Sequence, residues 1–105
     1  MFNDANQENA INVITAGILG ASGQSCIAGS RLYLQEKIYD EFLDKLSKRA
    51  GKIKIGAPMD PETEMGPISN YKQLEVIEKK IKLTLEQGGR LKCGGQRHSF
   101  SNEGY

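Results

Sequence analysis

The sequence predicts an α/β fold in which short strands pair in parallel and helices cover them. Three stretches carry apolar residues at helical spacing, and between them lie short segments where apolar and polar residues alternate. Glycine and proline mark the joins between these elements. Strands that are separated by helices pair in parallel through crossover connections. Because two or three short strands make only a thin sheet, we expect a piece of a parallel sheet rather than a complete one.

The first element is expected to be an apolar helix. Asp4 and Gln7 have the spacing of a capping box at a helix start. Residues 10–19 are nearly all apolar, so this helix should be buried on most sides. Glycines become frequent after that, and the helix should end near Ala21 or Ser22. A turn that contains Cys26 follows directly.

A strand and a second helix are expected next. Residues 30–35 read SRLYLQ, and their alternation is typical of a short strand. Residues 36–52 return to helical spacing, with one row of large apolar side chains. Residues 52–56, KIKIG, are a weaker candidate for a strand. Three prolines and a glycine then exclude a regular element from residues 57–67.

The last helix has clear start and stop signals. It should open at Ser69 or Asn70, carry a buried apolar stripe, and stop at the glycine pair of residues 88–89. Residues 90–93, RLKC, read as a short strand, and a polar, glycine-rich tail follows. The predicted order is helix, cysteine turn, strand, helix, loop, helix and strand.

Composition excludes several classes of protein. The 105 residues suffice for one small domain, and the net charge of +1 gives no reason to expect nucleic acid or an anionic membrane as a partner. No apolar run approaches the roughly 20 residues of a membrane span, and the first ten residues do not resemble a secretory signal. Two distant cysteines and one histidine offer neither a disulfide framework nor a metal site. We therefore expect a cytoplasmic protein with reduced thiols and no bound metal.

The most informative stretch is GQSCIAGS, residues 23–30, where Cys26 stands among very small side chains. A free thiol is only about 3% thiolate at neutral pH unless its surroundings help it. Small neighbours let a flat electrophile reach the sulfur, and the backbone N–H of Cys26 could face an oxygen that develops charge. The residues alone leave two interpretations open, a nucleophile or an idle thiol in a turn.

The motif and its surroundings resemble the aldehyde dehydrogenase superfamily. The resemblance rests on GQSCIAGSRLYLQEKIYDEFLDKL, on IGAPMDPETEMGP, on the preceding FNDANQENAINVITAGI, and on GGRLKCGGQR with the final GY. It runs from about Phe2 to Tyr105, so residues 1–105 are expected to be part of the catalytic domain of such an enzyme.

The resemblance implies oxidation of an aldehyde to a carboxylic acid with NAD or NADP. Cys26 matches the family nucleophile, whose thiolate forms a thiohemiacetal and then a thioester that water hydrolyses. Its backbone amide would hold the oxyanion together with an asparagine from elsewhere. Ser25 is expected to face the substrate, whereas Gln24 shapes the turn and Arg31 anchors the strand.

Other motifs of the family do not occur in these residues. The Glu-Leu-Gly-Gly motif with the general base and the Glu-x-Phe-Gly-Pro cofactor contact are missing, and no glycine-rich phosphate loop follows a strand. We therefore expect a fragment without the nucleotide-binding domain, which binds no NAD or NADP alone and does not turn over aldehyde. Family members commonly associate, so a homo-oligomer is expected.

Two further functions are alternatives to this interpretation. A non-catalytic fragment that acts only in self-association is the stronger alternative, because a partial sheet leaves strand edges and apolar helix faces uncovered. An RNA-binding Gly-x-x-Gly loop at residues 20–23 would want basic neighbours, and none occurs between Asp4 and Cys26. His98 is expected to be a solvated side chain, and Cys93 a structural one.

Overall fold

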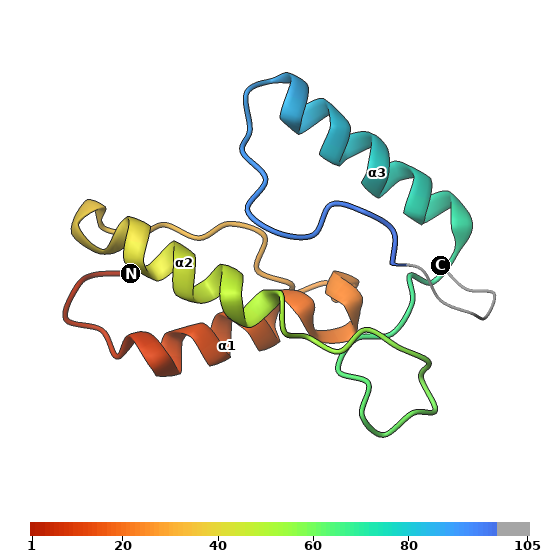
Figure 1. Cartoon of the computed structure of the whole chain (residues 1–105), viewed down its shortest axis with the longest axis horizontal. Helices are drawn as coiled ribbons and strands as arrows, with labels where there is room; N and C mark the ends of the chain where they lie inside the picture. The colour runs from red at the N-terminus through yellow and green to blue at the C-terminus, as the bar shows by residue number, and fades with distance from the viewer. Residues whose placement is uncertain (99–105) are drawn as a thin grey trace. The chain divides into compact units, whose positions relative to one another are not determined.

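The computed structural model describes residues 1–98. The chain divides into two compact units, residues 1–53 and the residues from 54 onward, and each unit is described by itself (Figure 1). The final glycine and tyrosine, which contributed to the family resemblance, lie outside the described residues.

The first unit begins with helix α1, Gln7–Leu19. Its N-cap is Asn6, whose side chain accepts a hydrogen bond of 2.9 Å from the amide of Asn9. The predicted start at Asp4 is therefore wrong by two residues, because an asparagine closer to the apolar run satisfies the first free amides equally well. The expected burial is also wrong, since Thr15 is the buried residue of α1 and Val13 is 64% exposed.

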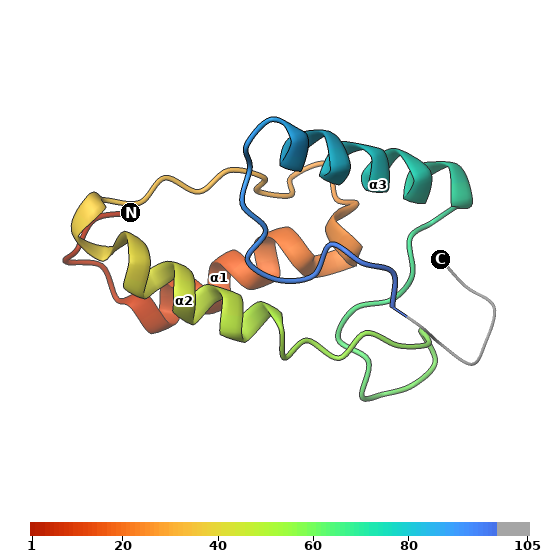
Figure 2. The same cartoon turned by 45° about the horizontal axis from the view of Figure 1, so that its top comes forward.

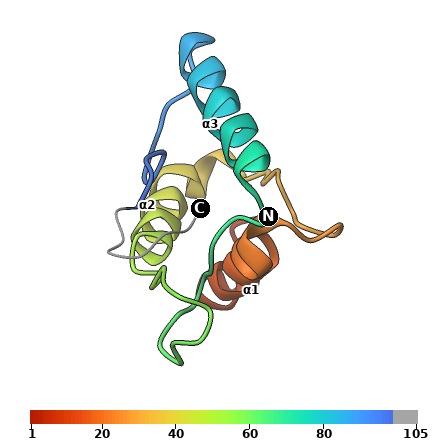
Figure 3. The same ribbon diagram turned by 90° about the vertical axis from the view of Figure 1, so that its right-hand side faces the viewer.

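Helix α2, Tyr39–Ala50, follows a short 3₁₀ turn, η2, at Glu36–Ile38. Helices α1 and α2 pack against each other and run in the same direction (Figure 2). Figure 3 looks nearly along both helices and shows them next to each other. Phe42 of α2 is fully buried and Ile38 nearly so, and these two side chains form the apolar core. The predicted helix over residues 36–52 is confirmed with slightly shorter bounds.

The predicted strand at residues 30–35 is not confirmed. Within residues 1–98 no strand ladder forms, because a ladder needs a neighbouring strand to take up its amides and carbonyls. Met1 takes the place of a neighbouring strand at one position. Its amino group donates to the Tyr33 carbonyl at 2.6 Å, and the Gln35 amide donates to the Met1 carbonyl at 3.0 Å. This is the hydrogen-bond pattern of one parallel pairing, which agrees with the predicted direction but gives no strand.

The second unit starts with an irregular segment. Ile55 and Met65 form an isolated parallel bridge, in which the Gly56 amide donates to the Met65 carbonyl at 3.1 Å. The bridge closes the proline-rich loop, so the weak strand candidate at residues 52–56 reduces to a single paired residue.

Helix α3, Tyr71–Glu86, has the predicted start and stop. Asn70 is the N-cap, and its side chain accepts from the Gln73 amide at 2.9 Å. At the other end Gly88, with φ of 90°, makes the left-handed turn of a Schellman motif. The Gly88 amide donates to the Leu85 carbonyl at 3.0 Å, and the Gly89 amide donates to the Thr84 carbonyl at 2.9 Å.

Residues 90–98 run back beside α3 within the second unit (Figure 1). The predicted strand at residues 90–93 is not confirmed, since no described segment pairs with it. Arg97 fixes this segment instead, because its guanidinium donates to both carboxylate oxygens of Glu78, one at 2.8 Å, and lies 5.7 Å from the Tyr71 ring centre. In the part of the chain that the structure describes, no helix is long and apolar enough to cross a membrane.

Candidate functional site

The chain turns sharply between α1 and Cys26. A short turn, η1, spans Gly20–Gly23, and inside it Ala21 and Ser22 have left-handed backbone angles, with φ of 50° and 55°. Gly23 follows with φ of 72°. Three successive residues of this hand reverse the chain at once, so Cys26 leaves the axis of α1.

The left-handed backbone has an energetic cost where a side chain is present. The left-handed region costs an L-residue roughly 1–2 kcal/mol, so Ala21 and Ser22 together cost about 2–4 kcal/mol. Glycine avoids this cost at position 23, where a side chain would also meet the Ile18 carbonyl oxygen at 3.2 Å. Strain of this kind persists where the surroundings impose it, and it clusters at functional sites.

Cys26 occupies the second position of a four-residue turn. The Ala28 amide donates to the Ser25 carbonyl at 3.1 Å and closes the turn, and the Gly29 amide donates to the Gly17 carbonyl of α1 at 3.3 Å. The Cys26 thiol is free and exposed. Its backbone N–H has no hydrogen-bond acceptor among residues 1–98. An accessible sulfur and an unused donor therefore lie at one corner of the chain.

The neighbours of Cys26 support the turn. The Gln24 side chain donates to the Ala21 carbonyl at 3.4 Å. The Ser25 hydroxyl accepts from the Ile27 amide, also at 3.4 Å. The expected contact of Ser25 with a substrate stays a prediction.

A hollow of about 240 Å³ lies between α1 and the segment after Cys26. Its lining is apolar except for one arginine and consists of Val13, Ile14, Gly17, Ile27, Gly29, Arg31 and Leu32. Ile27, the residue next to Cys26, is 87% exposed at its edge. The hollow could take an apolar group beside the cysteine turn, so Arg31 lines a hollow in addition to the anchoring role expected of it.

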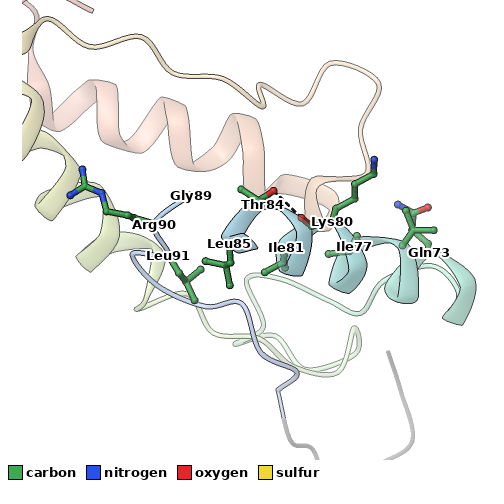
Figure 4. A pocket seen from close by; sticks show the side chains of 10 residues that line it. Gln73, Ile77, Lys80, Ile81, Thr84, Leu85, Gly89, Arg90 and Leu91 are labelled. Atoms are coloured by element: carbon green, nitrogen blue, oxygen red, sulfur yellow. Dashed lines mark hydrogen bonds between the residues drawn. The ribbon is translucent and has the colours of Figure 1, made fainter. Parts of the chain in front are cut away.

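A larger groove of about 410 Å³ lies on α3 and was not foreseen from the sequence (Figure 4). Its lining comprises Gln73, Val76, Ile77, Lys80, Ile81, Thr84, Leu85, Gly89, Arg90 and Leu91. The Thr84 hydroxyl donates to the Lys80 carbonyl at 2.8 Å and so serves its own helix. The groove is mainly apolar, which favours a packing surface over a reaction centre. The sequence signal for this groove is the apolar stripe of α3. The prediction that the stripe is buried is wrong, because no residue of α3 is buried and Leu85 is 44% exposed.

The other cysteine and the described acidic residues of the second unit form no reaction centre of their own. Cys93 is free and exposed, which does not support the structural role expected of it. Glu62 accepts from the Lys54 ammonium at 2.5 Å, and Glu64 accepts from the Lys54 amide at 3.1 Å, so both carboxylates support their own loop. The hydrogen bond from Arg97 holds the pKa of Glu78 below its usual range, and this pair fixes the chain rather than a ligand.

Residues 1–98 contain no phosphate-binding turn of the kind that holds a nicotinamide dinucleotide. Its phosphates are normally held by a glycine-rich turn between a strand and a helix. Here Gly17 lies inside α1 and Gly23 follows it, so the glycines leave a helix rather than open one. Residues 1–98 contain no group of three or more potential metal ligands.

Comparison with known proteins shows the family of the chain. The profile of the aldehyde dehydrogenase family matches residues 1–105, the whole chain. The chain belongs to the aldehyde dehydrogenase family. Enzymes of this family oxidise aldehydes with a nicotinamide cofactor, and the predicted family is confirmed.

Individual relatives show how much of the family fold is covered. A (Z)-2-((N-methylformamido)methylene)-5-hydroxybutyrolactone dehydrogenase of Acinetobacter baylyi is 46% identical over 91% of this chain and 20% of its own length. A solved aldehyde dehydrogenase of Bacillus cereus matches with a TM-score of 0.93 and 39% identity, over 100% of this chain and 21% of that one. An NAD⁺ complex from the same organism matches with a TM-score of 0.91 and 40% identity, over 98% and 21%.

The chain therefore spans about a fifth of the length of the relatives it matches. The solved structures have the aldehyde dehydrogenase fold, which confirms the predicted α/β class although the strand positions are not confirmed. The NAD⁺ complex supports NAD as a cofactor in the family.

Proposed function

We propose that Cys26 is the nucleophile of an NAD(P)-dependent aldehyde dehydrogenase and that these 105 residues are part of its catalytic domain. What carries the proposal is one observation: an exposed thiol and an unused backbone donor share a turn in a chain that matches the family throughout. The small side chains of the Gly-Gln-Ser-Cys motif leave both groups open to a flat electrophile.

The first half of the reaction belongs to the residues of this turn. The Cys26 thiolate attacks the aldehyde carbon, a carbon–sulfur bond forms, and the carbonyl π electrons move onto the oxygen. The Cys26 N–H, free to donate, faces this oxygen and lowers the energy of the charge that develops on it. The product of this step is a thiohemiacetal on the protein.

The second half needs groups beyond this turn. A nicotinamide cofactor supplies a hydride acceptor when it is bound, and no residue in the described part is assigned to it. The acyl group stays on Cys26 as a thioester until water attacks its carbonyl and the thiolate leaves. A positioned base is worth about 10²–10⁴-fold in such a step. Because the 105 residues contain no Glu-Leu-Gly-Gly motif, we expect no turnover of aldehyde by this chain alone.

The nucleophile is tested with an aldehyde labelled with ¹³C at its carbonyl carbon. We expect the NMR signal of a thiohemiacetal to saturate at an aldehyde concentration about tenfold lower for Cys26 than for Cys93, because one amide donor assists at the first site. The matched variants are Cys93→Ser, which keeps the tighter adduct, and Cys26→Ser, which loses it. Equal affinity at the two thiols contradicts the assignment.

The isolated chain is tested by NADH absorbance. With aldehyde and NAD⁺ present, we expect no steady NADH production above that of a Cys26→Ala control. Continuous production that depends on Cys26 would show that these residues suffice for both halves of the reaction.

Self-association is the second candidate function. It is favoured by the α3 groove, whose apolar lining is partly exposed, with Val76 at 45% and Leu91 at 51% exposure. Gel filtration should then give a mass above that of one chain, rising with concentration. A monomer at every concentration, with cooperative unfolding, contradicts this function and the expected homo-oligomer.

A further inference from the structure

The hand of the backbone in the cysteine turn decides what the Cys26 amide can bind. In a right-handed α-helix each N–H donates to the carbonyl four residues earlier. If α1 continued without a break, the Cys26 amide would donate to the Ser22 carbonyl and would be lost as a donor. The left-handed angles of Ala21 and Ser22 stop that continuation, and the amide stays without an acceptor in the described part of the chain.

The surroundings hold this hand in place. The Gln24 amide donates to the Ala21 carbonyl at 3.1 Å, and the Gln24 side chain donates to the same oxygen at 3.4 Å. The bond between Gly29 and Gly17 returns the chain to α1 and fixes the other side of the turn. Local preference therefore opposes the left-handed angles at Ala21, and the closed turn imposes them.

We propose that Ala21 and Ser22 are positioning residues, whose left-handed backbone keeps the Cys26 amide available to an oxyanion. The inference rests on the proposed function, because it explains how the same cysteine gains its oxyanion donor. Neither residue touches the reacting atoms, and both act through the direction of the chain.

The role of the left-handed backbone at Ala21 is tested on chains made by chemical synthesis. A synthetic thioester of residues 1–25 is ligated to residues 26–105 at Cys26, which leaves the native sequence, and Cys93→Ser throughout removes the second thiol. Ala21→D-Ala favours positive φ, whereas Ala21→Val disfavours it. Ala16→Val makes the same change at a right-handed position inside α1 and is the matched control.

Two reagents separate positioning from folding. p-Nitrophenyl acetate acylates the thiolate: a sulfur–carbon bond forms, an oxyanion intermediate collapses, and p-nitrophenolate leaves and is measured by absorbance. Iodoacetamide alkylates the same thiolate with loss of iodide and passes through no oxyanion. The ratio of the acylation rate to the alkylation rate therefore reports the amide donor and cancels changes in exposure or thiol ionisation.

We expect Ala21→Val to lower this ratio by about tenfold, since a single oxyanion donor is worth about 10²–10³ in an enclosed site and water competes at an exposed one. Ala21→D-Ala should keep or raise the ratio, and Ala16→Val should leave it unchanged. A ratio that falls with D-Ala overturns the proposal, even where the valine variant does not fold. An unchanged ratio in a folded Ala21→Val chain overturns it as well.

Failure of this inference is distinct from failure of the proposed function. If the Cys93→Ser parent acylates Cys26 no faster, relative to alkylation, than a separately expressed Cys26→Ser chain acylates Cys93, the nucleophile itself is wrongly assigned. If the parent ratio is high at Cys26 and does not depend on the hand of residue 21, only the positioning role is wrong.

Discussion

Truncation of Phe42 should remove a large part of the stability of the first unit. Phe42 is 0% exposed and lies on the face of α2 that packs against α1. Loss of a buried phenyl ring costs about 3–5 kcal/mol, and the half-exposed surroundings place Phe42→Ala near the lower figure because they can relax into the space. A domain of this size has about 5–15 kcal/mol in total, so the loss is severe.

Urea unfolding followed by far-UV circular dichroism measures the effect. With a urea dependence of about 1.5 kcal/mol per M, a loss of about 3 kcal/mol lowers the midpoint by about 2 M. The matched control is Tyr39→Ala, which removes an aromatic ring from the same helix where the side chain is 43% exposed, and should cost less than about 1 kcal/mol. Equal losses in the two variants would refute the packing of α2 through Phe42.

Three further perturbations test other features. The Thr15 hydroxyl is buried and has no acceptor or donor among residues 1–98, so Thr15→Val should stabilise the chain by about 1 kcal/mol in urea unfolding; a destabilisation would contradict this. Gly89→Ala would bring a methyl group to 2.8 Å from the Thr84 carbonyl oxygen, so we expect the free energy of unfolding to fall by about 1–3 kcal/mol. An unchanged free energy of unfolding would contradict this geometry at the end of α3. Because the hydrogen bond from Arg97 lowers the pKa of Glu78, the stability that this pair contributes is present above the usual carboxyl pKa and is lost as the pH falls through the lowered value. The urea midpoints of the parent and Glu78→Gln should therefore converge in acid, and a gap that does not depend on pH would exclude the pair.

Helices α2 and α3 could be predicted because their signals are local. Asn70 supplies the cap of α3 and the glycine pair at residues 88–89 supplies its Schellman turn, and each needs only residues within one or two turns. The strand at residues 30–35 could not be established in the same way. Alternation shows which side chains share a face, whereas a strand also requires a partner, and only Met1 pairs there among the described residues.

The candidate site was predictable in place but not in detail. The motif puts Cys26 in a turn after the first helix, and the structure has it there, exposed. The left-handed angles at Ala21 and Ser22 could not be foreseen, because alanine and serine carry no preference for positive φ. They arise from closure of the turn, which depends on contacts several residues away. The catalytic role of Cys26 stays a prediction.

The backbone bond from Gly29 to Gly17 closes a small ring of chain around the cysteine. Breaking that bond opens the ring without disturbing Phe42 or the packing of α1 on α2. We therefore expect the cysteine turn to open locally while the helices persist, so that the exposure of the thiol changes without global unfolding. Heat or denaturant that leaves the helical signal intact would still alter the chemistry of the sulfur.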